Sequence, residues 1–333
     1  MTKLDNHPHT PRQYARLYLT GFAMGVADLI PGVSGGTMAF ILGIYEDLIN
    51  AIKSFNIDAL RLLIGAKFKA LLEHIPWQFV IALMFGIGSA VLLLANVMEW
   101  LLVNQPQYLF AFFFGLIIAS IIAVGVHIRW SRLTWAMLII GTVVAFIIVN
   151  LIPVNMPHDP LTLFLSGAVA IMAMILPGIS GSFILLILGQ YDYVLSAVSD
   201  LNLLVVLPVA AGAAVGLLFF ARVLSWLLNR YEQATIAVLV GFMIGSLWEI
   251  WPWKIVTETY IDRHGEVAPL VEANVLPNFA SGEFFGAVVL AVFGFFLVSY
   301  LDHLQSQSNP VMRALGLNGR QPPLATEQPD VRA

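Results

Sequence analysis

Ten hydrophobic runs, separated by short polar segments, extend from residue 14 to residue 301. A membrane-spanning helix needs about 20 apolar residues to cross a hydrocarbon core of roughly 30 Å. Several runs reach this length, but the four that flank two Pro-Gly motifs have only 16 or 17 residues. We expect those four to be half-helices or short tilted spans. The ten runs are Tyr14–Ile30, Thr37–Ile52, Gln78–Leu102, Tyr108–Ile128, Leu133–Ile152, Leu161–Leu176, Phe183–Val198, Leu203–Leu228, Ala234–Trp251 and Glu283–Leu301.

The composition is that of a membrane protein. Hydrophobic residues make up 59% of the 333 residues and charged residues 11%, and the mean hydropathy is +0.86. A soluble domain cannot bury so much apolar surface, so the sequence predicts an all-α polytopic membrane protein. The lack of cysteine excludes disulfides and Cys-ligated metals, and a formal charge of −4 offers no basic surface for nucleic acid. No metal or nucleotide motif occurs, so we expect no cofactor and no bound metal.

The chain contains an internal repeat. PGVSGG at Pro31–Gly36 recurs as PGISGS at Pro177–Ser182, and seven of the fifteen residues from 31 to 45 recur at a shift of 146. Further matches between residues 86 and 120 follow at a shift of 126. The difference of 20 residues corresponds to a segment at about 55–74 that only the first half carries, and its pattern is typical of an amphipathic interfacial helix. We therefore predict two repeats of five runs each, at 14–152 and 160–302.

Lysine and arginine residues predict the topology. We expect the protein to lie in the inner membrane. If the first two runs form a hairpin that returns to its starting side, both termini and the short loops that contain Lys or Arg lie in the cytoplasm. A hairpin plus three spans gives each half an odd number of crossings, which makes the halves inverted-topology repeats. Charge counting does not separate re-entrant hairpins from short full spans, but short runs with Pro-Gly tips favour re-entry. We expect disordered tails at 1–13 and 303–333, and an extramembrane loop at about 252–282.

The two Pro-Gly tips are the candidate site. Hydroxyl residues suit a helix N-cap, glycine permits close approach of a ligand, and free N–H groups at a helix start attract anions. Two tips that meet near the midplane could hold a phosphate or carboxylate, whereas the alternative is that small residues only permit tight helix packing. The candidate substrate-binding residues at the tips are Pro31, Gly32, Ser34, Gly35, Gly36, Thr37, Pro177, Gly178, Ser180, Gly181 and Ser182.

Four ionisable residues in or near the hydrophobic runs are candidates for coupling, gating or binding, because an unpaired charge there is costly. Asp28, which Met174 replaces in the second half, could carry a proton or be satisfied by nearby N–H groups or Ser34. Glu46 and Asp192 each follow a tyrosine that recurs in both halves. The sequence does not distinguish whether they cap a helix or gate the site. Arg222 could contact a phosphate near the cytoplasm, or extend to the interface.

Two rival functions use the same motifs. Residues 32–35 and 178–181 fit the G-x-S-G pattern of rhomboid-type intramembrane serine proteases, but that chemistry needs a histidine base near the serine. The seven histidines lie in tails, in loops or near the end of a span, so we expect that the protein is not an enzyme. A small-anion transporter or channel remains an alternative, since it would need the tips but no opening toward the lipid.

Three stretches resemble the prokaryotic polyprenyl-phosphate transporter family. They are ADLIPGVSGGTMAFILGIYEDLI at 27–49, ILPGISGSFILLILGQYDYV at 175–194, and the pair GLIIAS and GFMIGS that begins at Gly115 and Gly241. The resemblance covers roughly residues 14–302. It implies a translocase that returns the lipid carrier undecaprenyl phosphate from the outer to the cytoplasmic leaflet for reuse in envelope synthesis. It further implies that the partner is this lipid, with ion or proton coupling and oligomeric state left open.

Overall fold

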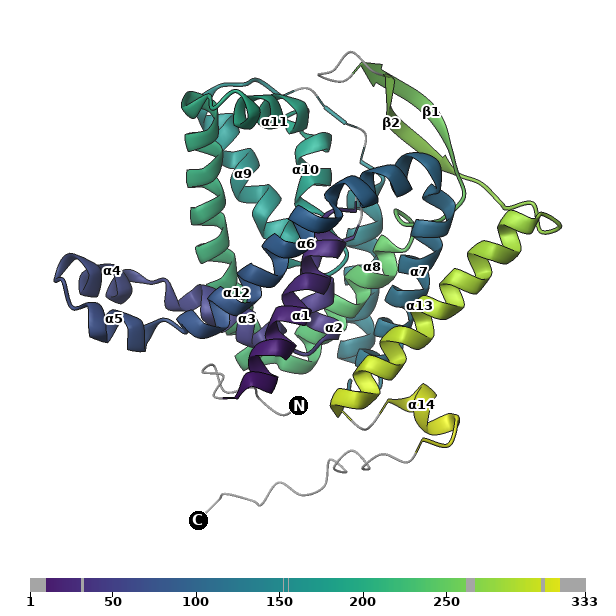
Figure 1. Ribbon diagram of the computed structural model, residues 1–333, viewed down its shortest axis with the longest axis horizontal. Coiled ribbons are helices and arrows are strands. Elements are labelled where there is room, and N and C mark those ends of the chain that lie inside the picture. The colour runs from purple at the N-terminus through teal and green to yellow at the C-terminus, as the bar shows by residue number, and fades with distance from the viewer. Residues whose placement is uncertain are drawn as a thin grey trace.

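Helices dominate the computed structural model, and a two-stranded sheet lies at one end of it (Figure 1). The structure describes residues 10–30, 33–151, 153–154, 156–261, 267–306 and 309–317. Within these ranges, five helices are long and apolar enough to cross a membrane, which agrees with the expected polytopic membrane protein. They are α6 (Trp77–Asn104), α7 (Pro106–Gly125), α8 (Arg132–Val149), α12 (Leu203–Ser246) and α13 (Gly282–Ser306).

Helix α12 contains two of the expected runs in one element. Its 44 residues would extend for about 66 Å at 1.5 Å per residue, which is twice the thickness of a hydrocarbon core. The backbone leaves helical geometry at Tyr231, where φ is −135° and ψ is 45°. This kink falls between the runs that end at Leu228 and begin at Ala234, so the two parts correspond to two separate expected spans.

Each Pro-Gly motif joins a longer helix to a broken one. In the first half, α1 (Pro11–Asp28) precedes the tip, and α2 (Gly35–Ile41) and α3 (Tyr45–Ser54) follow it. In the second half, α9 (Pro160–Ile175) precedes the tip, and α10 (Gly181–Ile187) and α11 (Tyr191–Ser199) follow it with a bend of 114°. We had expected one short helix after each tip. The breaks occur because Gly43 and Gly189, equivalent residues, have φ of +69° and +64°, which ends a right-handed helix.

Glycine contacts between helices repeat from one half to the other. In the first half, Gly21 of α1 faces the backbone of Leu83, and Gly86 of α6 faces that of Tyr18. The second half has the same contacts at the equivalent positions, which are Gly167 with Val209 and Gly212 with Phe164. A side chain at any of these glycines would collide with backbone, so the close approach of α1 to α6 and of α9 to α12 depends on them.

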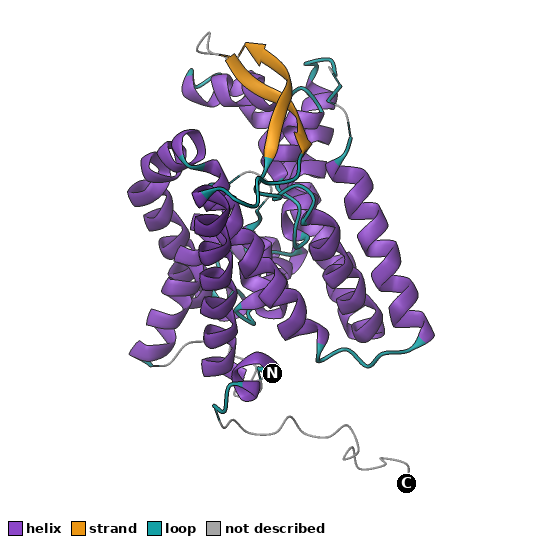
Figure 2. Cartoon of the chain, turned by 90° about the vertical axis from the view of Figure 1, so that its right-hand side faces the viewer, coloured by secondary structure: helices purple, strands orange, loops and turns teal. Residues whose placement is uncertain are grey.

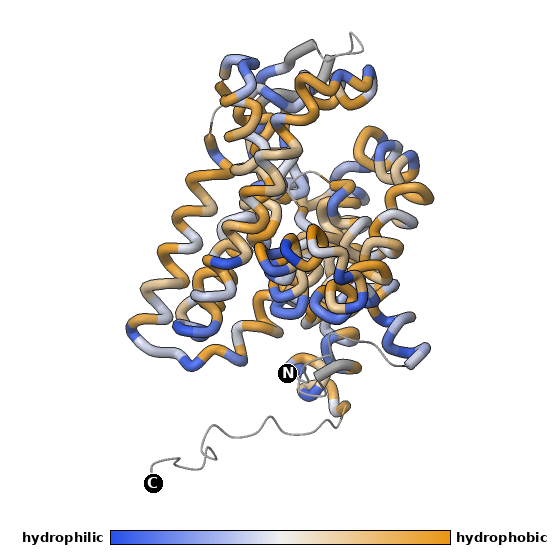
Figure 3. Tube along the Cα trace, turned by 90° about the vertical axis from the view of Figure 1, so that its left-hand side faces the viewer, coloured by the Kyte–Doolittle hydropathy of each residue, from blue (hydrophilic) through white to orange (hydrophobic). Residues whose placement is uncertain are grey.

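The remaining helix pairs are exchanged between the halves. Helix α7 of the first half packs along α13 of the second, where Gly115 meets the backbone of Ala291 and Gly294 meets that of Phe112. The C-terminal part of α12 packs along α8 in the same way, through Gly241 with Leu138 and Gly141 with Val238. The two interfaces match position by position. They join the halves into one bundle, and hydrophobic residues run along its long helices (Figure 3).

Three segments outside the bundle have more regular structure than the sequence predicts. The segment at 55–74 forms two short helices, α4 (Ile57–Ile64) and α5 (Phe68–His74), because the chain turns at Ala66 with φ of 50°. The expected loop at 252–282 contains an antiparallel hairpin of β1 (Lys254–Ile261) and β2 (Val267–Asn274), so the chain is not wholly α-helical (Figure 2). The tails expected to be disordered contain regular structure at their inner ends.

The start of α1 and a short helix after α13 lie in these tails. A capping box of Thr10 and Gln13 starts α1 at Pro11. Helix α14 (Pro310–Ala314) is capped by Asn309, whose amide also donates to Asp302 of α13. Met312 is buried, which fixes α14 against the bundle. Residues 1–9, 307–308 and 318–333 of the tails lie outside the described residues.

A charged cluster connects the β-hairpin to the end of α12. Lys254 donates to Glu272 at 3.0 Å and lies 3.8 Å from Glu249. Burial raises the pKa of Glu249 to about 6, and the charge of Lys254 opposes this shift. The indole of Trp251 donates to the carbonyl of Val275, which holds the end of the hairpin beside the same residues.

The glycine contacts predict the effect of adding one methyl group to α6. Gly86→Ala would push against the backbone of Tyr18, whereas Gly88→Ala would place its methyl in open space and gain helix propensity. We expect Gly86→Ala to lower the melting temperature of the purified protein by roughly 3 °C or more, and Gly88→Ala to leave it equal or higher. Equal losses in the two variants, measured by thermal unfolding in detergent, would contradict the proposed contact.

Candidate functional site

The two tips lie against each other in the interior of the bundle. In Figure 1, α1 reaches its tip from the end of the molecule where α14 lies, and α9 reaches its tip from the end where β1 and β2 lie. Helix α2, which follows the first tip, packs against α9, which precedes the second. Ser34 and Thr37 have no exposed surface, and Ser180 has 6%. Three polar residues of the two motifs are therefore buried, and Ser182 is half-buried.

The first tip is held by its own side chains. Ser34 is the N-cap of α2, and its Oγ accepts from the N–H of Gly36 at 3.0 Å. The carboxylate of Asp28 accepts from the N–H of Gly35 at 2.7 Å. Asp28 therefore has the N–H partner that one of its two expected interpretations required. Pro31 and Gly32 lie outside the described residues, so nothing follows for their expected role.

Three hydrogen bonds cross from the first tip to the second. Ser34 Oγ donates to the carbonyl of Met174 at 2.9 Å, and Thr37 Oγ1 accepts from the N–H of Gly178 at 2.8 Å. Tyr45 Oη donates to the carbonyl of Ile175 at 2.9 Å. The hydroxyls of the first half thus satisfy backbone groups that the turn at the end of α9 leaves without helical partners. In a dry interior these bonds hold the tips together.

The second tip has a tighter turn and more open polar groups. Gly178 has φ of +93°, and Cβ at this position would lie 2.5 Å from Ser246 Oγ of α12, so glycine is required there. Pro177 is buried beside it. Ser180 and Ser182 share a hydrogen bond of 2.7 Å. Within the described part of the chain, the N–H groups of Gly181 and Ser182 have no acceptor, unlike those of Gly35 and Gly36.

The other predicted site residues lie apart from this contact. Glu46 and Asp192 are in the first turns of α3 and α11, where an acidic side chain interacts favourably with the positive end of the helix dipole. Arg222 is exposed on α12, and its guanidinium donates to the carbonyl of Leu218 on the same helix at 2.7 Å. The structure does not bring these three residues to the tips.

Sequence reasoning missed one residue that connects the tips. Tyr45 was noted only as one of a repeated pair with Tyr191, yet its hydroxyl crosses to the second half and its side chain is 3% exposed. The pair itself gives no hint of this bond, because the repeat places a tyrosine at the equivalent position of both halves. The missed signal was the asymmetry around the pair, since Thr37 is replaced by Phe183 in the second half.

Three of the four histidines of the described residues have partners away from both serines, and Nδ1 of the fourth, His303 of α13, is buried without a hydrogen-bond partner among the described residues. His127 bonds to the carbonyl of Ala123 on its own helix, and His158 bonds to Gln190 and stacks on Tyr193. His74 contacts Asn56 beside α4. These contacts place all three rings outside the contact between the tips.

The tip contact predicts unequal roles for the two repeated tyrosines. Tyr45→Phe removes the hydroxyl that satisfies the buried carbonyl of Ile175, whereas Tyr191→Phe is the same change at the equivalent position and leaves the crossing bond intact. We expect Tyr45→Phe to lower the free energy of unfolding by about 1–2 kcal/mol, and Tyr191→Phe to lower it by less. Unfolding in a mixed-detergent titration measures both; equal effects would show that the crossing bond adds no stability.

Comparison with known proteins gives a consistent picture. Residues 24–268 match the family described as undecaprenyl phosphate translocase-like. The chain is 43% identical over 267 residues to a protein of Vibrio cholerae serotype O1 named polyprenyl-phosphate transporter, and the match covers 79% of this chain and 86% of that relative. A Staphylococcus aureus protein of the same name is 32% identical over 254 residues, which is 70% of this chain and 85% of the relative.

No solved structure matches the chain. The family match includes both Pro-Gly motifs and the whole contact between them, and the two relatives are aligned over most of their length. The resemblance seen in the motifs is thereby confirmed, and the chain belongs to the undecaprenyl phosphate translocase-like family.

Proposed function

We propose that this protein carries polyprenyl phosphate across the inner membrane, from the outer to the cytoplasmic leaflet. The names of the two relatives and the family description support the substrate. The observation that carries the proposal is the buried contact between two polar tips, one from each half of an apolar bundle. A charged head group needs such polar partners to pass through hydrocarbon, while its isoprenoid chain stays in lipid.

The two halves are inverted repeats with re-entrant hairpins in this proposal. Each tip then enters from a different side of the membrane, and both termini are cytoplasmic. The arrangement of basic residues favours this orientation, as does the position of α14 and β1 at opposite ends of the bundle (Figure 1). Inverted halves can exchange roles between two related states, which gives the head group access to each leaflet in turn.

The tips form the head-group cradle in one of these states. Ser180, Ser182 and the N–H groups at the start of α10 are the first donors that a phosphate meets, because the N–H groups have no acceptor within the described residues. Ser34 and Thr37 bond across the tips when no head group is present. They turn to the phosphate as the tips separate, so both hydroxyls have a partner in each state.

Acidic residues couple and gate the cycle. Asp28 accepts from the N–H of Gly35, so protonation of Asp28 weakens this bond and frees the N–H for a phosphate. A proton taken up with the lipid would in this way offset part of its charge. Glu46 and Asp192 begin the outer helices α3 and α11 on opposite sides of the tips, where they act as gates.

The cradle predicts a loss of transfer without a loss of folding. Ser180→Ala/Ser182→Ala removes both hydroxyls of the second tip, whereas Ser199→Ala removes a hydroxyl that bonds to the carbonyl of Leu195 within α11. We expect the double variant to slow transfer of a fluorescent polyprenyl phosphate between the leaflets of proteoliposomes by about tenfold or more, and Ser199→Ala to leave it unchanged.

Three results would contradict this function. Transfer by the double variant at the rate of the unchanged protein would exclude the cradle. Counterflow of inorganic phosphate without lipid transfer would instead favour a small-anion transporter. Covalent labelling of Ser34 or Ser180 by a serine-directed probe would favour a protease. Melting temperatures of all variants serve as the control for folding.

The cysteine-free chain makes the topology directly testable. Arg12→Cys and Lys69→Cys should react with a membrane-impermeant maleimide only after the cells are opened, because both positions are cytoplasmic in the proposed topology. Met156→Cys and Asp200→Cys, which flank the second hairpin, should both react in intact cells. If Met156→Cys and Asp200→Cys instead lie on opposite sides, the second hairpin crosses the membrane and is not re-entrant.

A further inference from the structure

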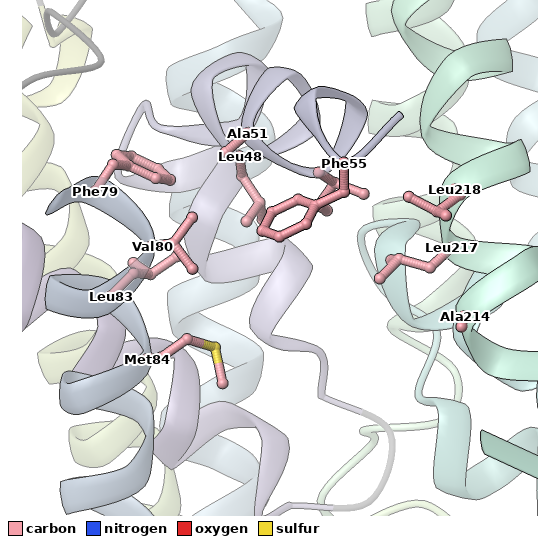
Figure 4. A pocket seen from close by; sticks show the side chains of 11 residues that line it. Leu48, Ala51, Phe55, Phe79, Val80, Leu83, Met84, Ala214, Leu217 and Leu218 are labelled. Carbon is pink, nitrogen blue, oxygen red and sulfur yellow. The ribbon is translucent and has the colours of Figure 1, made fainter. Parts of the chain in front are cut away.

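An apolar cavity of about 370 Å³ lies between α3, α6 and α12. All eleven residues that line it are apolar, and they come from both halves of the chain. Figure 4 shows Phe55 and Leu218 toward one end of the cavity, and Met84 and Ala214 toward the other. Its volume lies within the range of about 300–1,000 Å³ that is typical of ligand pockets. Met84 is 56% exposed, so the cavity opens sideways to the lipid.

Three residues of the cavity have counterparts in the second half. Leu48, Ala51 and Phe79 of the cavity correspond to Val194, Ala197 and Val205 at the repeat shifts of 146 and 126. Those three second-half residues pack together in a hydrophobic cluster with Leu163. In the first half, Ala51 and Phe79 also belong to the main hydrophobic core, and Leu48 packs against that core.

The insert changes the packing partner of α3. In the second half, only residues 200–202 separate α11 from α12, so the two helices pack where they meet. In the first half, α4 and α5 lie between α3 and α6, and α3 packs mainly against α12 of the other half. Helices α4 and α5 extend to one side of the bundle near α3 and α12 in Figure 1. The insert thus separates α3 from α6 along the chain, and the cavity lies between α3, α6 and α12.

Two cationic side chains lie beyond the Phe55 end of the cavity. Lys53 precedes Phe55 by two residues, and its Nζ donates to Ser225 Oγ of α12 at 3.2 Å. Arg222 is one turn beyond Leu218 on α12, and its guanidinium bonds back to the carbonyl of that cavity residue. In the part of the chain that the structure describes, neither side chain forms an ion pair.

An unused donor lies at the same end. The ring of Trp77, the first residue of α6, packs edge-on against Phe55 with 5.7 Å between ring centres. Its indole N–H is buried and has no hydrogen-bond partner among the described residues. A buried donor without a partner is costly, which makes it available to a ligand oxygen.

We propose that this cavity binds the isoprenoid chain of polyprenyl phosphate, and that Lys53 and Arg222 hold the phosphate at its cytoplasmic end. The proposal rests on the proposed function and adds a second binding place to it, beside the insert and separate from the tips. An apolar space with cations at one end matches a lipid anion in both parts of the molecule. It also gives Arg222 a role in binding, although Arg222 is exposed and does not contact the tips.

Filling the cavity tests where the chain binds. Ala214→Trp places an indole in the cavity, and Val215→Trp places the same group at the next position of α12, which is exposed and does not line the cavity. We expect Ala214→Trp to weaken binding of polyprenyl phosphate to the purified full-length protein in nanodiscs by about tenfold, with binding of inorganic phosphate unchanged. Val215→Trp should bind both ligands as the unchanged protein does.

Removing the charges tests where the phosphate binds. Lys53→Gln/Arg222→Gln should weaken binding of polyprenyl phosphate by about tenfold and leave the weaker binding of the neutral polyprenol unchanged. The charge-preserving variant Lys53→Arg/Arg222→Lys should restore most of the affinity. Melting temperatures identify any variant that fails to fold, and a Leu217→Phe variant, with a smaller added volume, then replaces Ala214→Trp.

The outcomes separate this proposal from the function on which it rests. Binding of polyprenyl phosphate by the unchanged protein, with equal affinity in Ala214→Trp and in Val215→Trp, overturns the cavity and leaves the transport function standing. Equal weakening of lipid and polyprenol by the charge variant overturns the role of Lys53 and Arg222. No binding of polyprenyl phosphate by the unchanged protein overturns the function and the cavity together.

Discussion

The fold depends on the need to satisfy backbone polar groups where two helices stop inside an apolar bundle. No water reaches the interior of a hydrocarbon layer, so each interrupted helix must find partners within the protein. Here the hydroxyls of Ser34, Thr37 and Tyr45 supply them to the turn at Met174–Gly178 of the other half. One tip satisfies the other, and in the proposed function the same groups become available to the head group when the tips move apart.

The two repeats are more alike in their helix contacts than in the polar side chains of their tips. Glycines recur at four of the tightest helix contacts, such as those of Gly21 and Gly167, since a collision with backbone has the same cost in both halves. Two of the polar side chains at the first tip do not recur, because Asp28 and Thr37 correspond to Met174 and Phe183. One half therefore supplies side-chain partners and the other mainly supplies backbone groups. Such a division suits a site with a single head group, which needs one set of donors and not two copies of it.

Much of this organisation can be predicted from the sequence, for definite reasons. The ten runs, the repeat and the shift of 20 residues follow from hydropathy and identity, which are local properties. The contact between the tips follows from two identical interruptions. The sequence does not show whether Gly43 and Gly189 break a helix or permit close helix packing, because it does not give their φ angles. The exchange of α7 and α8 between halves, and the cavity beside Phe55, depend on which helix faces which, and an apolar run carries no such information.

The exchanged helices set a condition on the origin of the chain. The glycine face of α7 packs against α13, and the glycine face of α8 packs against the C-terminal part of α12. Each half therefore buries these helix faces only against the other half. A chain of half this length would leave both faces open to lipid and would become complete only beside a second copy. Fusion of two such copies turns an encounter between molecules into a contact within one. It also lets the two copies diverge, which a pair of identical subunits cannot do.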